Sequence, residues 1–456
     1  MTPAPNIILI NCDDLGYGDL GCYGSTRNAT PHLDALARGG LRLTDYYVMS
    51  PVCSASRAAL LTGCYPARIG FEEYPVLFPG NPVGLDPKET TLAGLLKEGG
   101  YATKIIGKWH CGDQPGFLPT RHGFDAYFGI PYSNDMGVQS NRRDGKGTPL
   151  PLMRDETVIQ EQPDQRGITE RYTDEALQWI NDHRQRPFFL YLAHMHVHVP
   201  LFVPKQFLEK STNGAYGAAV AAIDWSTGMI VHRLRELGLL ENTLILFTSD
   251  NGSRVRDEGG SNAPCRGTKG TTWEGGQRVP CIVHWPEKIQ PGTVWNGLAR
   301  SVDLLPTLSR FAGIAARPAL PIDGIDLSAQ FLDPTLESPN DTLAYYRRER
   351  LEAVRVGDWK LHFGKDGEPL RELYHLRDDI GETRNLYTAQ PEVVARLEMV
   401  AETFRCRFGD LVTGQKGTEC RPIGRVENPR KLTRLNPDYP YMIAEYDLPD
   451  MPRMCG

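Results

Sequence analysis

The chain has 456 residues, of which 40% are hydrophobic and 23% charged, a balance typical of a globular protein and unlike that of a disordered or fibrous one. Its formal net charge is −6, without a long block of like charge, which argues against nucleic-acid binding as its main function. No apolar run in the sequence approaches the ~20 residues that a membrane helix needs. We therefore expect neither nucleic acid nor a membrane among its partners.

Short apolar strands alternate with amphipathic helices over the first two thirds of the chain. Asn6 opens a run of Ile and Leu typical of a buried strand, and a helix then runs from Pro31 to a stop at Gly39. This alternation predicts an α/β fold with a large, mostly parallel central sheet flanked by helices. The further predicted elements are helix 91–99, strand 101–106, helix 170–183, strand 187–193, helix 216–239, strand 243–248, strand 279–285 and helix 302–312.

The pattern changes beyond about residue 340. Short segments separated by turn residues predict a small antiparallel sheet, followed by a helix over 391–404 and a Pro-rich tail. The predicted strands are 343–346, 351–356, 359–363 and 372–376. We therefore divide the chain into a large domain, 1–340, and a C-terminal subdomain, 341–456, and assign no oligomeric state.

The ten cysteines form no CxxC pair and show no Cys/His zinc spacing. Reduced thiols in a cytosolic protein are the simplest interpretation, and disulfides in a secreted protein remain the alternative. The N-terminal segment lacks the basic region, long apolar core and cleavage site of a signal peptide. The sequence as given predicts a cytoplasmic protein, or a periplasmic or secreted one if a leader has been removed.

Polar side chains follow two of the predicted strands directly. Asp13 and Asp14 come after the first strand, and Asp250 and Asn251 come after the strand at 243–248. Open α/β sheets bind ligands at the carboxyl ends of their strands. Three carboxylates and a carboxamide offer oxygen donors that suit calcium or magnesium and not zinc. A turn with solvated acids is the alternative for Asp13 and Asp14 taken alone.

The segment 51–63 contains a cysteine and an arginine four positions apart at the start of a predicted helix. Residues four apart share a helix face, so Cys53 and Arg57 should point the same way. Cys53 could be a thiolate nucleophile activated by the helix N-terminus and a cation. A small buried cysteine beside a surface arginine is the alternative.

Cys53-Ser-Ala-Ser-Arg57 resembles the motif of the type I sulfatases, in which the cysteine is converted after translation to formylglycine. The family usually carries Pro where this chain has Ala55. Further matches occur in the family's order, and one of them, 129–133, resembles the branch of arylsulfatase A and N-acetylgalactosamine-6-sulfatase. The other matching segments are 13–24, 100–110, 250–252 and 267–276.

The resemblance implies an alkaline-phosphatase-like sandwich and a sulfatase that cleaves an aryl or carbohydrate sulfate monoester. It also implies a formylglycine-generating enzyme as maturation partner. A single divalent metal, Ca²⁺ with Mg²⁺ as the alternative, would be bound by the side chains of Asp13, Asp14, Asp250 and Asn251 and by an oxygen of modified Cys53.

The remaining implied roles follow from the charge of a sulfate ester. Lys108 and Lys269 would be the cations over the sulfate oxygens, Ser133 would donate a hydrogen bond to the sulfate or the leaving group, and Arg57 would orient the nucleophile. One hydroxyl of the aldehyde hydrate would attack sulfur, and the other would then expel sulfate. His110 is the implied base for that expulsion.

Three histidines at alternate positions compete for the role of leaving-group acid. On an extended strand, His194, His196 and His198 would share one face. The family places its acid two residues before the proline that ends this segment, which selects His198, with His196 as the fallback. A transition-metal site formed by the three histidines is the competing interpretation.

Two other functions remain open. A phosphonate monoesterase or phosphodiesterase would share the formylglycine and much of the site, and the segment 134–165 is expected to line the pocket that decides between them. A non-catalytic relative would keep Cys53 unmodified. Alkaline phosphatase itself fits less well, because its two zinc ions need several histidine ligands, whereas Asn251 and Lys269 suit a single-metal site. Trp109 and Tyr132 are candidates for stacking on a sugar or aryl ring, with packing as the alternative.

Overall fold

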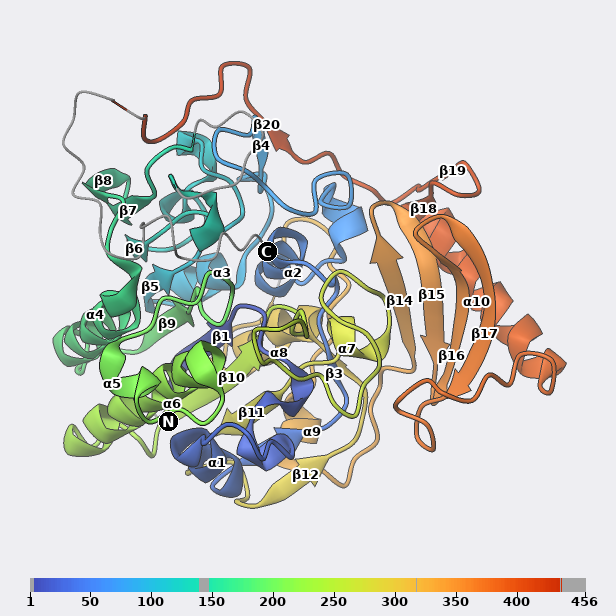
Figure 1. The fold of residues 1–456 in the computed structure, drawn as a ribbon, viewed down its shortest axis with the longest axis horizontal. Helices are drawn as coiled ribbons and strands as arrows, with labels where there is room; N and C mark the ends of the chain where they lie inside the picture. The colour runs from blue at the N-terminus through green and yellow to red at the C-terminus, as the bar shows by residue number, and fades with distance from the viewer. Residues whose placement is uncertain (1–3, 139–146, 317, 435, 437–456) are drawn as a thin grey trace.

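The computed structural model describes residues 4–138, 147–316, 318–434 and 436. Its centre is a ten-stranded sheet with helices on both faces (Figure 1). In spatial order the strands are β12 (Thr293–Trp295), β2 (Leu41–Leu43), β11 (Cys281–His284), β10 (Thr243–Ser249), β1 (Asn6–Cys12), β9 (Phe188–Ala193), β5 (Ala102–Gly107), β6 (Ala126–Gly129), β7 (Pro151–Arg154) and β8 (Thr157–Glu161).

The middle of this sheet is parallel, and its flanks contain antiparallel pairs. β10, β1, β9, β5 and β6 run parallel to one another, whereas β11 is antiparallel to β10 and β7 is antiparallel to β6. The predicted strand 279–285 is thus β11 in the antiparallel sense. The chain enters β11 from β10 through a long loop without a full crossover helix, the connection that an antiparallel neighbour permits.

Side-chain alternation along β1 divides the interior into two cores. Ile8 and Ile10 point to one face of the sheet, whereas Ile7 and Leu9 point to the other, as the period of two requires.

The predicted helices are confirmed, with ends shifted by a few residues. The helices of the large part of the molecule are α1 (Pro31–Arg38), α2 (Cys53–Thr62), α3 (Leu92–Glu98), α4 (Ile168–Asp182), α5 (Lys205–Leu208), α6 (Gly214–Glu236), α7 (Glu274–Gln277), α8 (Leu304–Phe311) and α9 (Ser328–Leu332). α1, α4 and α6 pack in the core that holds Ile8 and Ile10, and α2, α3 and α8 pack in the core that holds Ile7 and Leu9.

The antiparallel C-terminal sheet predicted from the sequence is present and projects to one side of the molecule (Figure 1). Its turns need positive φ, which Gly357 and Gly367 supply at +57° and +93°. The helix expected over 391–404 continues to Phe408. The elements are β14 (Thr342–Arg347), β15 (Arg350–Val356), β16 (Trp359–Lys365), β17 (Glu368–His375) and α10 (Pro391–Phe408).

The chain after α10 returns to the larger part of the molecule. β20 (Gly424–Arg425) pairs with β4 (Val83–Gly84) in the antiparallel sense. The chain after α10 therefore contacts the part of the molecule that holds the ten-stranded sheet as well as the C-terminal sheet. The domain boundary near residue 340 stays a prediction.

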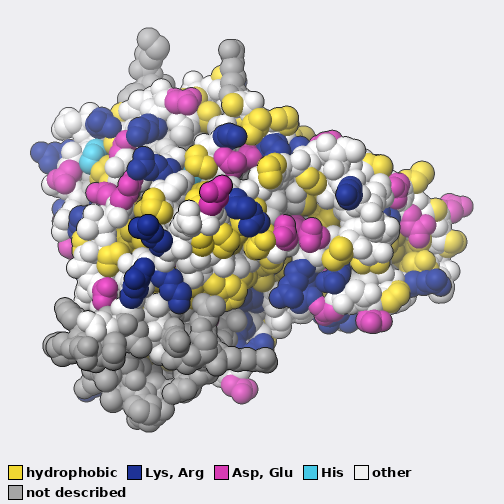
Figure 2. Space-filling model, turned by 90° about the horizontal axis from the view of Figure 1, so that it is seen from above, with side chains coloured by type: hydrophobic (Ala, Val, Ile, Leu, Met, Phe, Trp, Pro, Cys, Tyr) yellow, Lys and Arg dark blue, Asp and Glu magenta, His cyan; other side chains and the backbone are white. Residues whose placement is uncertain are grey.

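On the face drawn in Figure 2, acidic and basic side chains are interspersed over both the larger part of the molecule and the projecting C-terminal part. Among the described residues, no helix is long and apolar enough to cross a membrane.

Candidate active site

The predicted oxygen donors meet at one edge of the sheet. β1 and β10 are parallel neighbours with Cys12 opposite Ser249, so the residues that follow both strands leave the sheet at the same place. The Asp14 backbone N–H donates to Asp250 Oδ1 over 3.3 Å, and Asn251 Nδ2 donates to Asp14 Oδ1 over 2.7 Å. The two motifs are therefore in direct contact.

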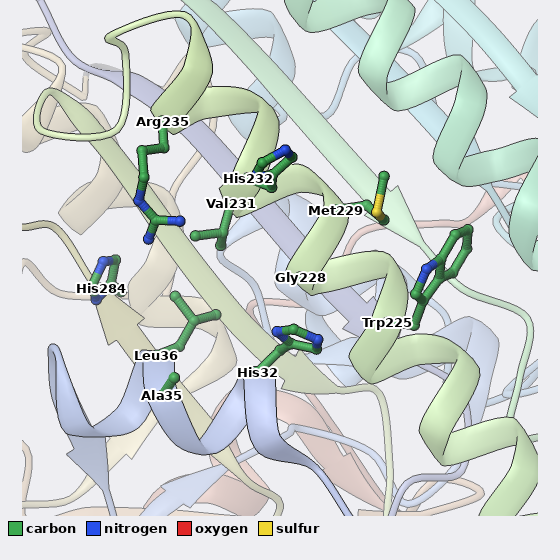
Figure 3. Close-up of a pocket in the computed structure, with 10 residues that line it drawn as sticks. All are labelled: His32, Ala35, Leu36, Trp225, Gly228, Met229, Val231, His232, Arg235 and His284. Carbon is green, nitrogen blue, oxygen red and sulfur yellow. The ribbon is translucent and has the colours of Figure 1, made fainter. Parts of the chain in front are cut away.

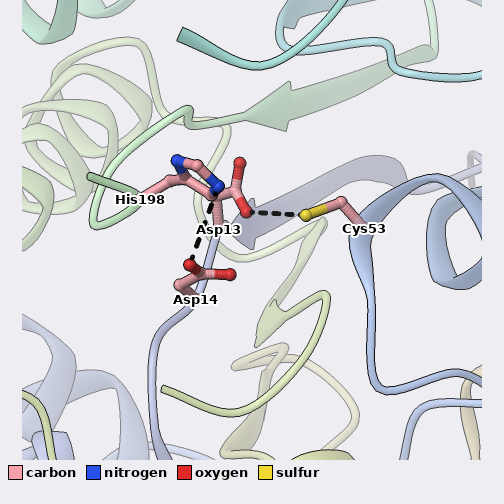
Figure 4. Close-up of side chains that lie close together, drawn as sticks. All are labelled: Asp13, Asp14, Cys53 and His198. Carbon is pink, nitrogen blue, oxygen red and sulfur yellow. Dashed lines mark hydrogen bonds and ion pairs between the residues drawn. The ribbon is translucent and has the colours of Figure 1, made fainter. Parts of the chain in front are cut away.

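Helix α2 brings Cys53 and Arg57 to this edge from the same face, as their spacing predicts. Cys53 Sγ lies 3.4 Å from Asp13 Oδ1 (Figure 4). Arg57 Nε donates to Asp250 Oδ2 over 2.8 Å, and its Nη1 donates to the Lys108 carbonyl over 2.9 Å. Both side chains are buried, so Arg57 is not the surface arginine of the alternative interpretation.

Two ammonium groups, a fully buried one on Lys108 and a largely buried one on Lys269, complete the charge cluster. Lys108, which follows β5, is paired with the carboxylate of Asp13, and its Nζ lies 3.3 Å from Ser133 Oγ. Lys269 Nζ lies 2.9 Å from Asp14 Oδ1. Each lysine predicted to bind sulfate therefore contacts a carboxylate predicted to bind the metal, and the two predicted sites are contiguous.

Of the three alternate histidines, His198 reaches the cluster. Its Nε2 lies 3.9 Å from Asp14 Oδ2, and its ring lies 3.4 Å from Ser133 Oγ. Figure 4 shows His198 beside Asp13, Asp14 and Cys53, which together could hold a metal ion.

The other two histidines lie elsewhere. His196 Nδ1 lies 3.3 Å from Thr169 Oγ1, and His194 has neither ring nitrogen hydrogen-bonded to another described residue. The expected extended strand is wrong here, because β9 ends at Ala193 and the histidines follow it in irregular backbone. The period-of-two argument no longer applies, and the described residues do not gather the three imidazoles into a metal site.

His110 lies buried beside the lysine that precedes it by two positions. Its Nε2 lies 2.9 Å from the Leu77 carbonyl, and its Nδ1 has no hydrogen-bond partner among the described residues. Its backbone has a φ of +61°, an uncommon conformation for a residue with a side chain. Its predicted role beside residue 53 stays a prediction.

The charges around Cys53 bear on its form as a nucleophile. Burial and the neighbouring charge of Asp13 raise the pKa of the Cys53 thiol, because the adjacent carboxylate and the loss of solvent outweigh the cations. This direction disfavours the thiolate considered from the sequence, which stays a prediction.

Burial and neighbouring charges raise the pKa of one group in the cluster and lower the pKa of two others. Burial and Asp13 raise the pKa of Asp250 to about 7. Burial also acts to raise the pKa of Asp13, but Lys108 and other cations outweigh it and hold that pKa well below its ordinary value. Burial and Lys269 lower the pKa of His198. Burial thus opposes charge on Asp250 and His198, whereas pairing with the cations favours the ionised form of Asp13.

Asn134 opens the segment 134–165 that the sequence analysis expected to line the pocket, but it received no individual role there. Its Oδ1 lies 3.1 Å from His198 Nδ1, which orients the ring that Ser133 also contacts. An amide directly after Ser133 was the available signal. Trp109, by contrast, is fully buried, packs against Phe124 and donates to the Phe117 carbonyl, so it is a packing residue and not a platform for a sugar ring.

A separate groove of about 420 Å³ lies between α1 and α6 (Figure 3). Its lining includes His32, Trp225, His232, Arg235 and His284. None of the predicted site residues lines it, and the histidines on α1 and α6 had been assigned no role from the sequence.

Comparisons with known proteins identify the family of this chain. The family model described as Sulfatase matches residues 5–314, and that described as N-sulphoglucosamine sulphohydrolase, C-terminal, matches residues 268–405. The chain is 41% identical to arylsulfatase A of Homo sapiens over 444 residues, with 87% of each chain covered. It is 41% identical to N-acetylgalactosamine-6-sulfatase of Canis lupus familiaris over 460 residues, with 90% of this chain and 87% of the relative covered.

A solved structure extends the likeness to the fold. The crystal structure of Ps i-CgsB in complex with k-i-k-neocarrahexaose matches with a TM-score of 0.78 at 30% identity, covering 88% of this chain and 92% of that chain. The chain belongs to the sulfatase family and is a sulfuric ester hydrolase with the alkaline-phosphatase-like fold.

Proposed function

We propose that this sulfatase hydrolyses an aryl or carbohydrate sulfate monoester, using formylglycine formed from Cys53 and one divalent cation, with Ca²⁺ favoured. The observation that carries the proposal is the convergence of Cys53, Lys108, Lys269 and His198 on the carboxylates of Asp13 and Asp14. The names of the relatives, arylsulfatase A and N-acetylgalactosamine-6-sulfatase, support the two substrate classes.

The residues present fit a hard divalent cation. Asp13, Asp14, Asp250 and Asn251 offer oxygen donors, the set that Ca²⁺ and Mg²⁺ prefer. Asn251 Oδ1 is buried without a hydrogen-bond partner among the described residues, and a buried carbonyl oxygen of this kind is costly unless a ligand satisfies it. Burial and the neighbouring Asp13 raise the pKa of Asp250 to about 7, and a bound cation would favour its ionised form. A bound cation would supply positive charge next to the sulfate oxygens.

The chain's own residues would then divide the work of binding and proton transfer. Lys108 and Lys269 would bind the nonbridging sulfate oxygens and stabilise the charge that grows in the transition state. Arg57 would hold Asp250 and the start of α2 in place. Formylglycine would supply, as its hydrate, the hydroxyl that attacks sulfur.

The histidines would carry the protons. His198, held by Asn134 and Ser133, would protonate the leaving alcohol. The neutral imidazole that burial favours would become cationic beside the bound anion. His110 would accept a proton from residue 53, with its buried and unpartnered Nδ1 as the available atom.

The test compares turnover of an aryl sulfate by the wild-type enzyme, coexpressed with a formylglycine-generating enzyme, with turnover by Cys53→Ala. We expect hydrolysis by the wild type and loss of activity to background in the variant, with an unchanged circular dichroism spectrum. Near-native turnover by Cys53→Ala would contradict the proposed nucleophile. A wild type that hydrolyses phosphonate or phosphate diesters in preference to sulfates would favour the alternative function.

A further inference from the structure

The loop that carries Lys269 is bound on two sides. On the active-site side, the Lys269 backbone N–H donates to the Ser253 carbonyl and the Gly270 N–H donates to the Pro51 carbonyl, both over 2.9 Å. These bonds connect the loop to the segment after Asn251 and to the segment before Cys53. The loop is thus a direct neighbour of both catalytic motifs.

On its other side, three residues further on, the loop contacts the C-terminal sheet. Lys360 Nζ, on β16, donates to the Thr272 carbonyl over 2.8 Å. Thr272 Oγ1 donates to Glu352 Oε2, on β15, over 2.7 Å. The backbone carbonyl and the side-chain hydroxyl of Thr272 are therefore both hydrogen-bonded to residues of the C-terminal sheet. That sheet contributes no predicted catalytic residue.

Lys360 is well suited to fix this loop. It is fully buried, and its three N–H donors find the Thr272 carbonyl, Glu274 Oε1 at 2.9 Å and Glu382 Oε1 at 2.9 Å. Glu382 also accepts a hydrogen bond from the Glu274 backbone N–H over 2.8 Å. A buried ammonium with all donors satisfied has little freedom to move, because any displacement leaves a charge unpaired.

A short rigid path connects Thr272 to Lys269. The Thr271 backbone N–H donates to the Thr268 carbonyl over 3.1 Å, and the Thr268 N–H donates to Thr271 Oγ1 over 3.2 Å. Lys269 lies inside this closed turn, and Thr272 follows it directly. A shift of Thr272 would therefore move the turn and the ammonium that it presents.

We propose that Lys360 is a positioning residue for Lys269. Together with Glu352 and Glu382, it fixes the 267–276 loop from the C-terminal sheet and so sets the position of the Lys269 ammonium over the sulfate. The inference rests on the proposed function, because it takes Lys269 to be a sulfate-binding cation.

A double-mutant cycle tests the coupling, using Lys360→Met, Lys269→Met and the double variant. The readouts are kcat/KM for an aryl sulfate and the Kd of inorganic sulfate measured by titration calorimetry. We expect Lys360→Met in the wild-type background to lower kcat/KM by about 10²-fold, the effect of a misplaced group, and to weaken sulfate binding. In the Lys269→Met background it should change either quantity by less than about twofold, because the group it positions is already gone.

The matched control is Lys104→Met. Lys104 is also buried and pairs with a glutamate, Glu175, at 2.8 Å, but it has no contact with the 267–276 loop. The fold-changes in kcat/KM and in the Kd of sulfate that Lys104→Met causes should multiply with those that Lys269→Met causes, as expected for independent sites. If Lys360→Met behaves in the same multiplicative way, its role is only structural and the proposal is overturned.

Two further arms keep the result decisive. If Lys360→Met does not fold, Thr272→Val, which removes only the bond to Glu352, should show the same non-multiplicative pattern with a smaller loss. A multiplicative pattern for Thr272→Val would overturn the proposal. Absence of turnover in a wild-type enzyme that carries formylglycine would refute the proposed function, whereas the sulfate-binding cycle would still decide whether Lys360 positions Lys269.

Discussion

Two buried charge clusters of similar composition lie on either side of the Lys269 loop. The active-site cluster has three acids, Asp13, Asp14 and Asp250, and three bases, Arg57, Lys108 and Lys269. The inter-sheet cluster also has three of each. Its members are Asp45, Glu274, Glu382, Arg278, Arg355 and Lys360.

The two clusters differ in how completely they satisfy their own polar groups. Arg57 Nη2 and Asn251 Oδ1 have no hydrogen-bond partner in the active-site cluster, whereas the described structure leaves no such buried atom on the six residues of the inter-sheet cluster. Buried polar groups are costly when they are unpaired. The inter-sheet cluster therefore satisfies its own polar groups, whereas the active-site cluster and the adjoining Asn251 leave polar atoms that a ligand could satisfy.

The largest effect is expected from a substitution that removes a cation from the active-site cluster. Lys269→Ala should lower kcat for an aryl sulfate by about 10²–10³-fold, because it removes a preorganised cation facing developing charge. Steady-state kinetics on the formylglycine-bearing enzyme measures this. A loss confined to KM would show that Lys269 only binds the ground state and would contradict its role in the transition state.

Breaking the inter-sheet cluster should affect stability instead. Glu274→Gln should lower the free energy of unfolding at pH 7 by about 3–5 kcal/mol, because it removes one partner from buried cations. Urea denaturation followed by fluorescence measures this. A loss below about 0.5 kcal/mol, the range of neutral surface changes, would show that the cluster does not stabilise the fold.

The same variant has a pH dependence with a defined sign. Burial opposes the charge of Glu274, but Lys360 and the arginines outweigh it and lower its pKa to about 2, from an ordinary value near 4.5. Its contribution to stability is therefore present above about pH 4.5 and lost as the pH falls towards 2. The difference in unfolding free energy between wild type and Glu274→Gln should shrink over this window. A difference that stays constant from pH 7 to pH 3 would contradict the lowered pKa.

Removing the metal should destabilise the active-site cluster by a smaller amount. A ligand that binds only the folded state at 100 times its Kd adds about 2.7 kcal/mol, so chelation should lower the melting temperature and added Ca²⁺ should restore it. Differential scanning calorimetry of the Asn251→Ala variant provides the control, which should respond less to chelator. An equal response in both proteins would place the ion elsewhere.

The smallest effect is expected in the groove between α1 and α6. His232 is 60% exposed at its side chain, and His232→Ala should change the free energy of unfolding by less than about 0.5 kcal/mol and leave kcat/KM unchanged. A clear loss of activity would show that the site extends beyond the cluster at β1 and β10.

Sequence reasoning succeeded where the relevant pattern is local. The strand that begins at Asn6, the helix face shared by Cys53 and Arg57, and the acids after two strands are all set within a few residues. It failed for the shared face of the three histidines, because the extended backbone assumed for 194–198 lies beyond the strand predicted at 187–193, and β9 does end at Ala193.

It also could not find the inter-sheet cluster. Glu274, on α7, and Lys360, on β16, are 86 positions apart. Neither residue type nor spacing indicates such a pair before the fold brings the loop and β16 together. The contact between Asn134 and His198 was not predicted for the same reason, since the two residues are 64 positions apart.

The central claim is that residue 53 carries the nucleophile as formylglycine, and peptide mass spectrometry across this position tests it most directly. The protein should be coexpressed with a competent formylglycine-generating enzyme. The account predicts a mass about 18 Da below that of the cysteine-containing peptide. An intact cysteine in a preparation that hydrolyses sulfate esters at full rate would contradict it.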